Sequence, residues 1–447
     1  MNTPIFDFVK AYAASEAARF HMPGHKGQAS LGCEALDITE IEGADVLYTA
    51  NGIIEESERN ASALFGTAHT YYSTEGSTLC IKAMLGLVAR ECGMGQKPLI
   101  LAARNVHKAF VYACALLDVN VCWLYPANGE HLCSCAVTPE DVENALREMR
   151  QKPHALYLTS PDYLGKVADI RGIAAVCHAY GVPLLVDNAH GAYLQFLEPV
   201  RHPIALGADL CCDSAHKTLP VLTGGAYLHI AKAAEHFCEL ASSTLSVFAS
   251  TSPSYLILQS LDLCNRTLST GYSARLCATV QRLEHIKQHM RAHGWCVTES
   301  EPLKLIVHAA KSGYTGKALA TYLRTQGIEP EFADSEYLVL MASPENRETD
   351  FARLQATFAK LAPKAPLPPY ASMNAERGQA CLSIREAVFA PRESISVENA
   401  VGRICASPTV SCPPAVPIVI SGERITEQAV RLFACYGIKQ VEVVKEY

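Results

Sequence analysis

A lysine in the middle of the chain could carry out covalent chemistry. Lys217 lies in the sequence Asp213-Ser-Ala-His-Lys-Thr218, directly after a largely apolar run, Ala208 to Cys212. Burial at the end of a strand disfavours the charged form of a lysine, which lowers its pKa and makes the amine nucleophilic. Such an amine can form a Schiff base with a carbonyl, including the aldehyde of pyridoxal phosphate (PLP). Ser214 and His216 could hydrogen-bond a phosphate, although ordinary surface turns use the same residue types.

Two further side chains with possible roles follow predicted strands. Asp187 comes directly after the apolar run Val182 to Val186, and His107 follows a strand predicted at Pro98 to Ala102. A carboxylate at Asp187 could keep a pyridine nitrogen protonated, or it could accept hydrogen bonds within a turn. His107 lies where ligands gather in open α/β sheets, but a solvated histidine in a loop fits the same pattern.

A helix start offers a possible phosphate site. Gly76, Ser77 and Thr78 open a helix predicted at Leu79 to Arg90. Free backbone N–H groups, hydroxyls and the positive end of the helix dipole together suit a phosphate group. An ordinary Ser/Thr cap needs the same residues, so composition alone leaves both interpretations open.

The elements that position these residues indicate an α/β fold. Short apolar runs alternate with helical segments, which is typical of βαβ units and a mostly parallel sheet. A length of 447 residues suggests two or three domains, and four prolines between Leu361 and Tyr370 indicate a linker. We expect an N-terminal arm at 1–30, a large domain at 31–265, a small α+β domain at 266–362 and a C-terminal domain at 363–447.

Composition excludes several classes of protein. The formal net charge is −7 without basic clusters, which argues against nucleic acid and anionic membranes as partners. No signal peptide and no apolar run of ~20 residues are visible, so we expect a cytoplasmic protein. The 18 cysteines are scattered through apolar stretches, as expected for reduced thiols. His285, His289 and His293 fall on one helix face, where a solvated surface is favoured over a metal site, so we predict no metal.

The order of these motifs resembles that of fold-type-I PLP enzymes and, more narrowly, the Orn/Lys/Arg decarboxylase family. The resemblance runs from about residue 18 to about residue 430. It is carried by six separated stretches: His21-Met-Pro-Gly-His-Lys-Gly27, Asp37-Ile-Thr-Glu-Ile41, Arg104-Asn-Val-His-Lys108, Val186-Asp-Asn-Ala-His-Gly191, Ser214-Ala-His-Lys-Thr-Leu219 and Pro413-Pro414 with Gly422-Glu423.

The resemblance implies a role for each matching residue. Lys217 would bind PLP covalently, Asp187 would pair with the pyridinium nitrogen, and His107 would stack on the ring with Ala189 on the other face. The phosphate would be held by Gly76, Ser77, Thr78, Ser214 and His216. Lys217 or His216 would return a proton to the α-carbon. Family members are commonly dimers or larger with the active site at a subunit interface, and we expect a homodimer or larger here.

The implied reaction is PLP-dependent decarboxylation of arginine, lysine or ornithine, which forms a diamine or polyamine. Two alternatives stay open: a PLP-dependent aminotransferase or lyase, and an inactive paralogue that acts as a regulatory subunit. A basic substrate needs a carboxylate for its distal cation, and the sequence does not choose among Glu42, Asp45, Asp162 and Glu423.

The chain departs from the family pattern at several points. We expect the short form of the family, without the extra N-terminal domain of larger members. Cys412 and Ala415 stand where Tyr and Gly are common, and Leu222-Thr-Gly-Gly225 lacks a Gln that often follows the Thr. These departures bear on the identity of the substrate more than on PLP binding.

Overall fold

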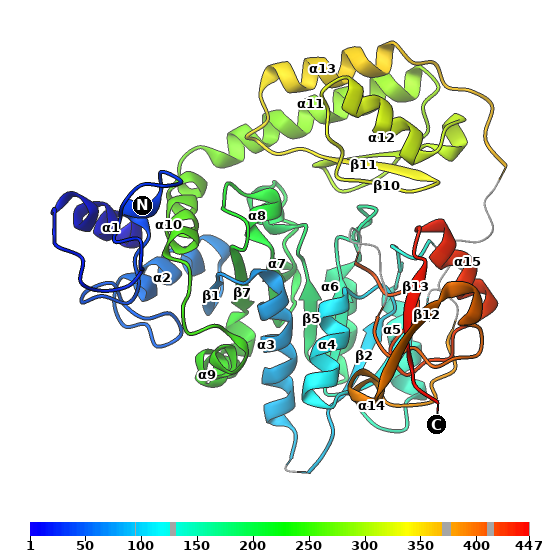
Figure 1. The fold of residues 1–447 in the computed structure, drawn as a ribbon, viewed down its shortest axis with the longest axis horizontal. Coiled ribbons are helices and arrows are strands. Elements are labelled where there is room, and N and C mark those ends of the chain that lie inside the picture. The colour runs from blue at the N-terminus through cyan, green and yellow to red at the C-terminus, as the bar shows by residue number, and fades with distance from the viewer. Residues whose placement is uncertain (94, 126–130, 369–376, 409–414, 447) are drawn as a thin grey trace. The chain divides into compact units, whose positions relative to one another are not determined.

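The computed structural model describes residues 1–93, 95–125, 131–368, 377–408 and 415–446 (Figure 1). The chain divides into two compact units. The first comprises Met1–Met94 and Ile170–Ala274, and the second comprises Gly95–Asp169 and Arg275–Tyr447. The predicted division into an arm and three domains stays a prediction.

The strands of the first unit carry most of the candidate residues at their ends. They are β1 (His69–Ser73), β5 (Leu184–Asp187), β6 (Leu210–Asp213) and β7 (Ala226–Ile230). The strands β5 and β6 pair in parallel, whereas β7 is antiparallel to both β6 and β1. Every residue of β5, β6 and β7 is buried, which explains why these segments read as continuous apolar runs.

Helices pack against these strands or against one another. Those within the first unit are α1 (Pro4–Ala14), α2 (Ile53–Phe65), α3 (Gly76–Glu91), α6 (Ile170–Ala179), α7 (Pro203–Leu206), α8 (Ala215–Thr218), α9 (Cys238–Phe248) and α10 (Tyr255–Ser269), and α11 (Tyr272–Ala292) runs on into the second unit. Short 3₁₀ helices lie at Glu34–Leu36, Ala192–Phe196 and Lys232–Phe237. Helix α2 ends at Gly66, whose φ of +70° favours glycine. Helix α3 contacts β6 and β7, and a hydrogen bond between Ser77 and Ser214 places its first turn near the end of β6.

The second unit contains parallel strands and two smaller sheets. The parallel strands are β2 (Leu99–Ala103), β3 (Asn120–Leu124) and β4 (Ala155–Thr159), with helices α4 (Lys108–Leu117) and α5 (Pro139–Glu148). Thr138 caps α5, and Asp141 completes a capping box.

The two smaller sheets have their own hydrophobic cores. The first, in the order β10-β11-β9-β8, comprises β8 (Val297–Thr298), β9 (Lys304–His308), β10 (Phe332–Ala333) and β11 (Tyr337–Met341), with α12 (Gly316–Thr325) and α13 (Glu348–Ala359). The second pairs β12 (Arg392–Ser396) with β13 (Gln440–Val444) and is accompanied by α14 (Ile384–Phe389) and α15 (Glu427–Cys435). Further 3₁₀ helices lie at Ala310–Ser312 and Val397–Asn399.

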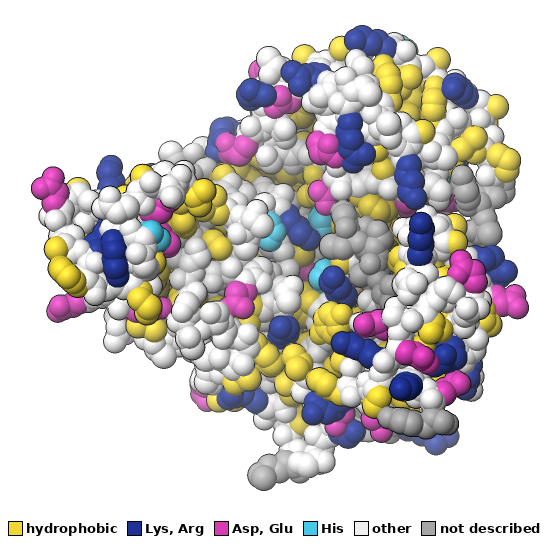
Figure 2. All heavy atoms as spheres, viewed as in Figure 1, with side chains coloured by type: hydrophobic (Ala, Val, Ile, Leu, Met, Phe, Trp, Pro, Cys, Tyr) yellow, Lys and Arg dark blue, Asp and Glu magenta, His cyan; other side chains and the backbone are white. Residues whose placement is uncertain are grey.

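The strand order of the large sheet is β1-β7-β6-β5-β4-β2-β3. The predicted α/β class with a mostly parallel sheet is confirmed, as are the additional small α+β elements. Among the described residues, no helix combines the length and the apolar character needed to cross a bilayer. Figure 2 shows acidic and basic side chains interspersed over the face in view.

Candidate active site

Lys217 lies on the short helix α8, directly after β6. Its backbone N–H donates to the carbonyl of Ser214 at 3.0 Å. Its Nζ lies 3.1 Å from Nε2 of His190, and this histidine is buried. We expected burial of the lysine, but its side chain is exposed in the single chain. The contact with His190 therefore orients the amine.

Asp187 ends β5, the strand next to the one that leads to Lys217. Its side chain is 2% exposed, and Oδ1 accepts the backbone N–H of Ala189 at 3.1 Å. The thiol of Cys212, its partner in the sheet register, lies 3.7 Å from the same oxygen. A buried carboxylate thus lies at the carboxyl end of one strand, and an amine follows the end of its neighbour. Ala189, two residues on, is also buried.

Hydroxyl groups meet at the first turn of α3. Ser214 Oγ donates to Ser77 Oγ at 2.7 Å, so the segment before α8 is tied to the helix start. Gly76 has a φ of +70°, and its N–H donates to the carbonyl of Gly224 at 2.7 Å. A Cβ on Gly224 would lie 2.9 Å from the carbonyl oxygen of Thr74, so glycine is needed for this close approach. The exposed Thr78 adds a third hydroxyl at the same turn.

His216 is held by the loop that precedes β7. Its Nδ1 donates to the carbonyl of Gly225 at 3.0 Å, and its backbone N–H donates to the same oxygen at 3.2 Å. Burial lowers the pKa of His216, and the nearby charge of Lys217 acts in the same direction, against the hydrogen bond to Gly225. The ring is therefore favoured in its neutral form, with the proton on Nδ1.

His107 belongs to the second unit, where it caps the start of α4. Its Nδ1 accepts the backbone N–H of Ala109 at 3.1 Å, which places the ring proton on Nε2. The side chain is half-buried. The capping bond holds the orientation of the imidazole plane.

The candidate carboxylates for a substrate cation differ in their surroundings. Asp45 accepts backbone N–H groups with both oxygens. Asp162 is buried and accepts the Ser134 hydroxyl and the Lys166 backbone N–H. Glu423 is buried, accepts the N–H of Ile420 at 3.0 Å and lies 3.9 Å from the guanidinium of Arg104. Glu42 is exposed, with no hydrogen-bond or ion-pair partner among the described residues.

Sequence reasoning gave no role to three residues that the structure brings to this site. His190 contacts Lys217, and Asn188 and Asp213 lie beside Asp187 and Ser214. The motif Val186 to Gly191 contains Asn188 and His190, and the motif that begins at Ser214 is preceded by Asp213. Their closeness in sequence to Asp187 and Lys217 is the signal that could have identified them. Cys412, one of the departures from the family pattern, and Pro413-Pro414, part of the resemblance, lie outside the described residues, whereas Ala415, the other departure, is buried with a φ of +58°.

Solved structures establish the class to which this fold belongs. The chain superposes on lysine decarboxylase LdcF from Francisella novicida with a TM-score of 0.81 at 15% identity, covering 99% of this chain and 81% of that one. Serine palmitoyltransferase from Sphingomonas wittichii gives a TM-score of 0.56 at 15% identity, with 80% and 83% covered. The fold is fold type I of the PLP-dependent enzymes.

Sequence comparisons identify the family within that class. The Orn/Lys/Arg decarboxylase major-domain model matches residues 3–310, and the model of the C-terminal domain of that family matches residues 370–437. Arginine decarboxylase from Bacillus cereus is 30% identical over 468 residues, covering 97% of this chain and 99% of the relative. The chain belongs to the Orn/Lys/Arg decarboxylase family, which makes it a PLP-dependent decarboxylase.

Proposed function

We propose that this protein decarboxylates a basic amino acid, with arginine as the first candidate. The observation that carries the proposal is the match along nearly the whole length of a relative named arginine decarboxylase. The presence of an amine, a buried carboxylate and a hydroxyl-lined helix start within one compact unit supports it.

The residues of the first unit fit PLP by their chemistry. We propose that Lys217 binds the aldehyde carbon, Asp187 pairs with the ring nitrogen and Ala189 packs against one ring face. The phosphate would be held by Gly76, Ser77, Thr78, Ser214 and His216. We propose that His107, from the second unit, stacks on the other ring face. When bound, PLP supplies an electron sink for the electron pair that remains as carbon dioxide departs.

The side chains of the site would then control charge and protons. Asp187 is buried, so its negative charge would act strongly on a positive ring nitrogen. His190 Nε2 can accept an N–H of the Lys217 amine and hold that amine in place. We propose Lys217 as the acid that protonates the α-carbon, because the neutral ring of His216 carries its proton on Nδ1, bonded to Gly225.

The four candidate acids for the distal cation of the substrate differ in whether their carboxylates already have partners within the fold. Asp45, Asp162 and Glu423 accept hydrogen bonds within the fold. Glu42 is exposed, and the described residues offer its carboxylate no partner. We propose Glu42 as the acid that binds the guanidinium or ammonium group of the substrate.

A homodimer or larger assembly is part of the same proposal. Phe20, Leu31 and Met22 in the N-terminal segment are 98%, 90% and 70% exposed, and a second copy would remove these side chains from water. We also propose that the protein works in the cytoplasm, in diamine or polyamine synthesis. Sedimentation of the purified protein at several concentrations would give the size of the assembly.

A substrate panel tests the proposed reaction. Arginine, lysine, ornithine and several neutral amino acids, each labelled in the carboxyl group, are supplied to the PLP-loaded protein. We expect labelled carbon dioxide and the matching amine from a basic amino acid, and a higher Michaelis constant after Glu42→Gln. Transfer of the amino group to a keto acid, or no turnover with any basic amino acid, would contradict the proposal.

A further inference from the structure

A buried carboxylate with no assigned role lies at the carboxyl end of β6, next to the end of β5. Asp213 is the last residue of β6, directly before Ser214, and its side chain is 0% exposed. Its Oδ2 accepts Nε2–H from His202 at 3.0 Å and from His229 at 3.1 Å. Its Oδ1 accepts from the side-chain amide of Asn188 at 2.7 Å, so both carboxylate oxygens are engaged.

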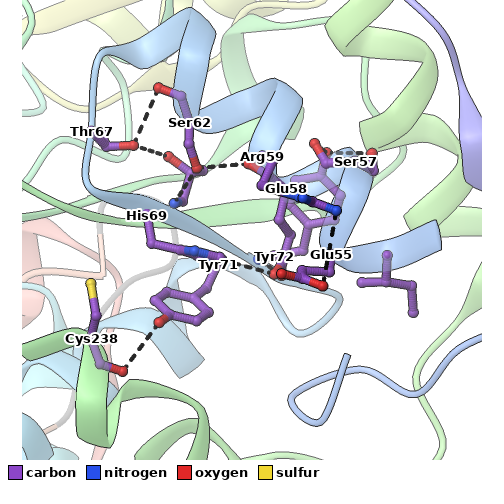
Figure 3. A network of polar contacts seen from close by, with 12 residues as sticks. Glu55, Ser57, Glu58, Arg59, Ser62, Thr67, His69, Tyr71, Tyr72 and Cys238 are labelled. Atoms are coloured by element: carbon purple, nitrogen blue, oxygen red, sulfur yellow. Dashed lines mark hydrogen bonds and ion pairs between the residues drawn. The ribbon is translucent and has the colours of Figure 1, made fainter. Parts of the chain in front are cut away.

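The hydrogen-bond directions follow from the chemistry of each group. A carboxylate only accepts, so His229 carries its proton on Nε2 and its Nδ1 accepts from the hydroxyl of Thr70 at 2.9 Å. Thr70 Oγ1 in turn lies 2.9 Å from Thr67 Oγ1. Figure 3 shows Thr67 and Ser62 within the polar network of α2 and β1. The contacts of Asp213 thus reach β1 through β7.

The electrostatics favour an ionised Asp213. Burial alone would raise its pKa, but His202 and His229 hold the pKa well below the ordinary value of an aspartate. Ligand atoms of His202, Cys211 and Asp213 lie within 4.8 Å of one another, which also permits a metal ion. Direct bonds from both imidazoles to one carboxylate oxygen account for the grouping without a metal.

Asn188 connects this carboxylate to the residue next to it on β5. Its backbone N–H donates to the carbonyl of Cys212 at 2.9 Å, beside the side-chain bond to Asp213. A Cβ on Gly191 would lie 2.0 Å from Asn188 Oδ1, so the amide is closely enclosed. Asn188 follows Asp187, and Asp213 precedes Ser214. The pair therefore joins the two strand ends one residue away from each proposed cofactor contact.

We propose that Asp213 is a positioning residue that fixes the carboxyl ends of β5 and β6, so that Asp187 and Ser214 stand at the right separation for PLP. This inference rests on the proposed function, because it takes Asp187 and Ser214 as cofactor contacts. Both carboxylate oxygens of Asp213 are bonded within the protein, so we assign it no direct contact with cofactor or substrate. Its loss leaves buried N–H groups without an acceptor, which favours rearrangement at these strand ends.

The chain offers a matched control at the opposite end of the same two strands. Asp209 precedes β6, and its Oδ2 accepts the backbone N–H of Leu184 at 2.7 Å and Nε2–H of His178 at 3.0 Å. Asp209→Asn therefore alters a carboxylate that bonds β5 and His178 of α6, a more exposed His–Asp pair than those of Asp213, at the other end of the strands from Asp187. It controls for general loss of stability.

The test measures PLP binding to cofactor-free Asp213→Asn, Asp209→Asn and wild-type protein by absorbance titration. We expect Asp213→Asn to raise the dissociation constant by about tenfold or more and to move the absorbance maximum of the bound cofactor. Asp209→Asn should keep both within about twofold. If Asp213→Asn does not fold, Thr70→Val removes only the hydroxyl that supports His229 and should weaken binding in the same direction by a smaller factor.

The outcomes separate this inference from the proposed function. If wild-type protein takes up no PLP at Lys217, the proposed function fails. If it does, and the aspartate variants match each other in binding and in absorbance maximum, Asp213 is merely structural and the inference is overturned. A stoichiometric metal ion in the wild type that Asp213→Asn loses would also overturn it.

Discussion

Replacement of Asp45 should separate a structural acid from a substrate-binding acid. Its Oδ2 accepts the N–H groups of Gly52 and Ile54 at 2.9 and 3.0 Å, at the start of α2. Its Oδ1 accepts those of Val46 and Asn51. The carboxylate therefore caps a helix and closes the loop before it. We predict that Asp45 contributes to stability and not to substrate binding.

The loss of stability expected for Asp45→Ala is the sum of three contributions. Loss of a cap to alanine costs about 0.5–2 kcal/mol, and loss of a charge at a helix N-terminus costs about 0.3–1 kcal/mol. Asp45 has a φ of +69°, a region that costs alanine about 1–2 kcal/mol more. Asp45→Ala should therefore lower the free energy of unfolding by about 2–5 kcal/mol. Asp45→Asn keeps an acceptor and tolerates this backbone, so it should cost about 1 kcal/mol.

Urea unfolding followed by circular dichroism, together with steady-state kinetics, tests this prediction. Burial acts to raise the pKa of Asp45, but the backbone N–H groups together hold it below its ordinary value. The stability advantage of the wild type over Asp45→Asn should thus be present above pH ~3.8. It should disappear as the pH falls below that value and Asp45 becomes protonated in the folded protein. The matched Glu42→Gln variant should show the reverse pattern, with unchanged stability and a raised Michaelis constant. A tenfold rise in the Michaelis constant of Asp45→Asn at unchanged stability would refute the reasoning.

Two further predictions concern buried charges. Lys304 Nζ lies 3.6 Å from Glu301 Oε1, and both side chains are buried. Lys304→Met should therefore lower the free energy of unfolding by about 3–5 kcal/mol, because it leaves a buried charge unpaired. Adding Glu301→Leu should recover part of that loss, as measured by urea unfolding. Burial raises the pKa of Asp262 to about 6, against the opposing effect of hydrogen bonds that its oxygens accept from the Ser57 hydroxyl and the Phe6 backbone N–H. Because the folded pKa lies above the ordinary value, stability relative to Asp262→Asn should fall by at most about 3 kcal/mol as the pH rises from ~4 to ~6. A difference between these proteins that does not change with pH would contradict the Asp262 prediction.

Much of the fold could be predicted because its signals are local. The buried strand at Leu184–Asp187 follows from the apolar run Val182 to Val186, and Thr138 with Asp141 three residues later has the pattern of a capping box at a helix start. The antiparallel pairing of β7 with β6 could not be predicted, since no local pattern specifies how a buried strand pairs.

The remainder of the site depends on contacts distant in sequence. His229 meets Asp213 only because β7 pairs with β6 in one register, and His202 reaches it from the segment before α7. Asp45 caps a helix that begins eight residues later, so the usual adjacent capping signature is missing. Such roles become visible only once the strands and loops are placed.

The most direct test of the account is the identity of the residue that carries the cofactor. PLP-loaded protein is reduced with borohydride, digested and mapped by mass spectrometry, in parallel with Lys217→Ala. We predict one PLP adduct at Lys217 in the wild type, and neither that adduct nor release of carbon dioxide from basic amino acids in the variant. An adduct on a different lysine, or undiminished release of carbon dioxide by Lys217→Ala, would contradict the account.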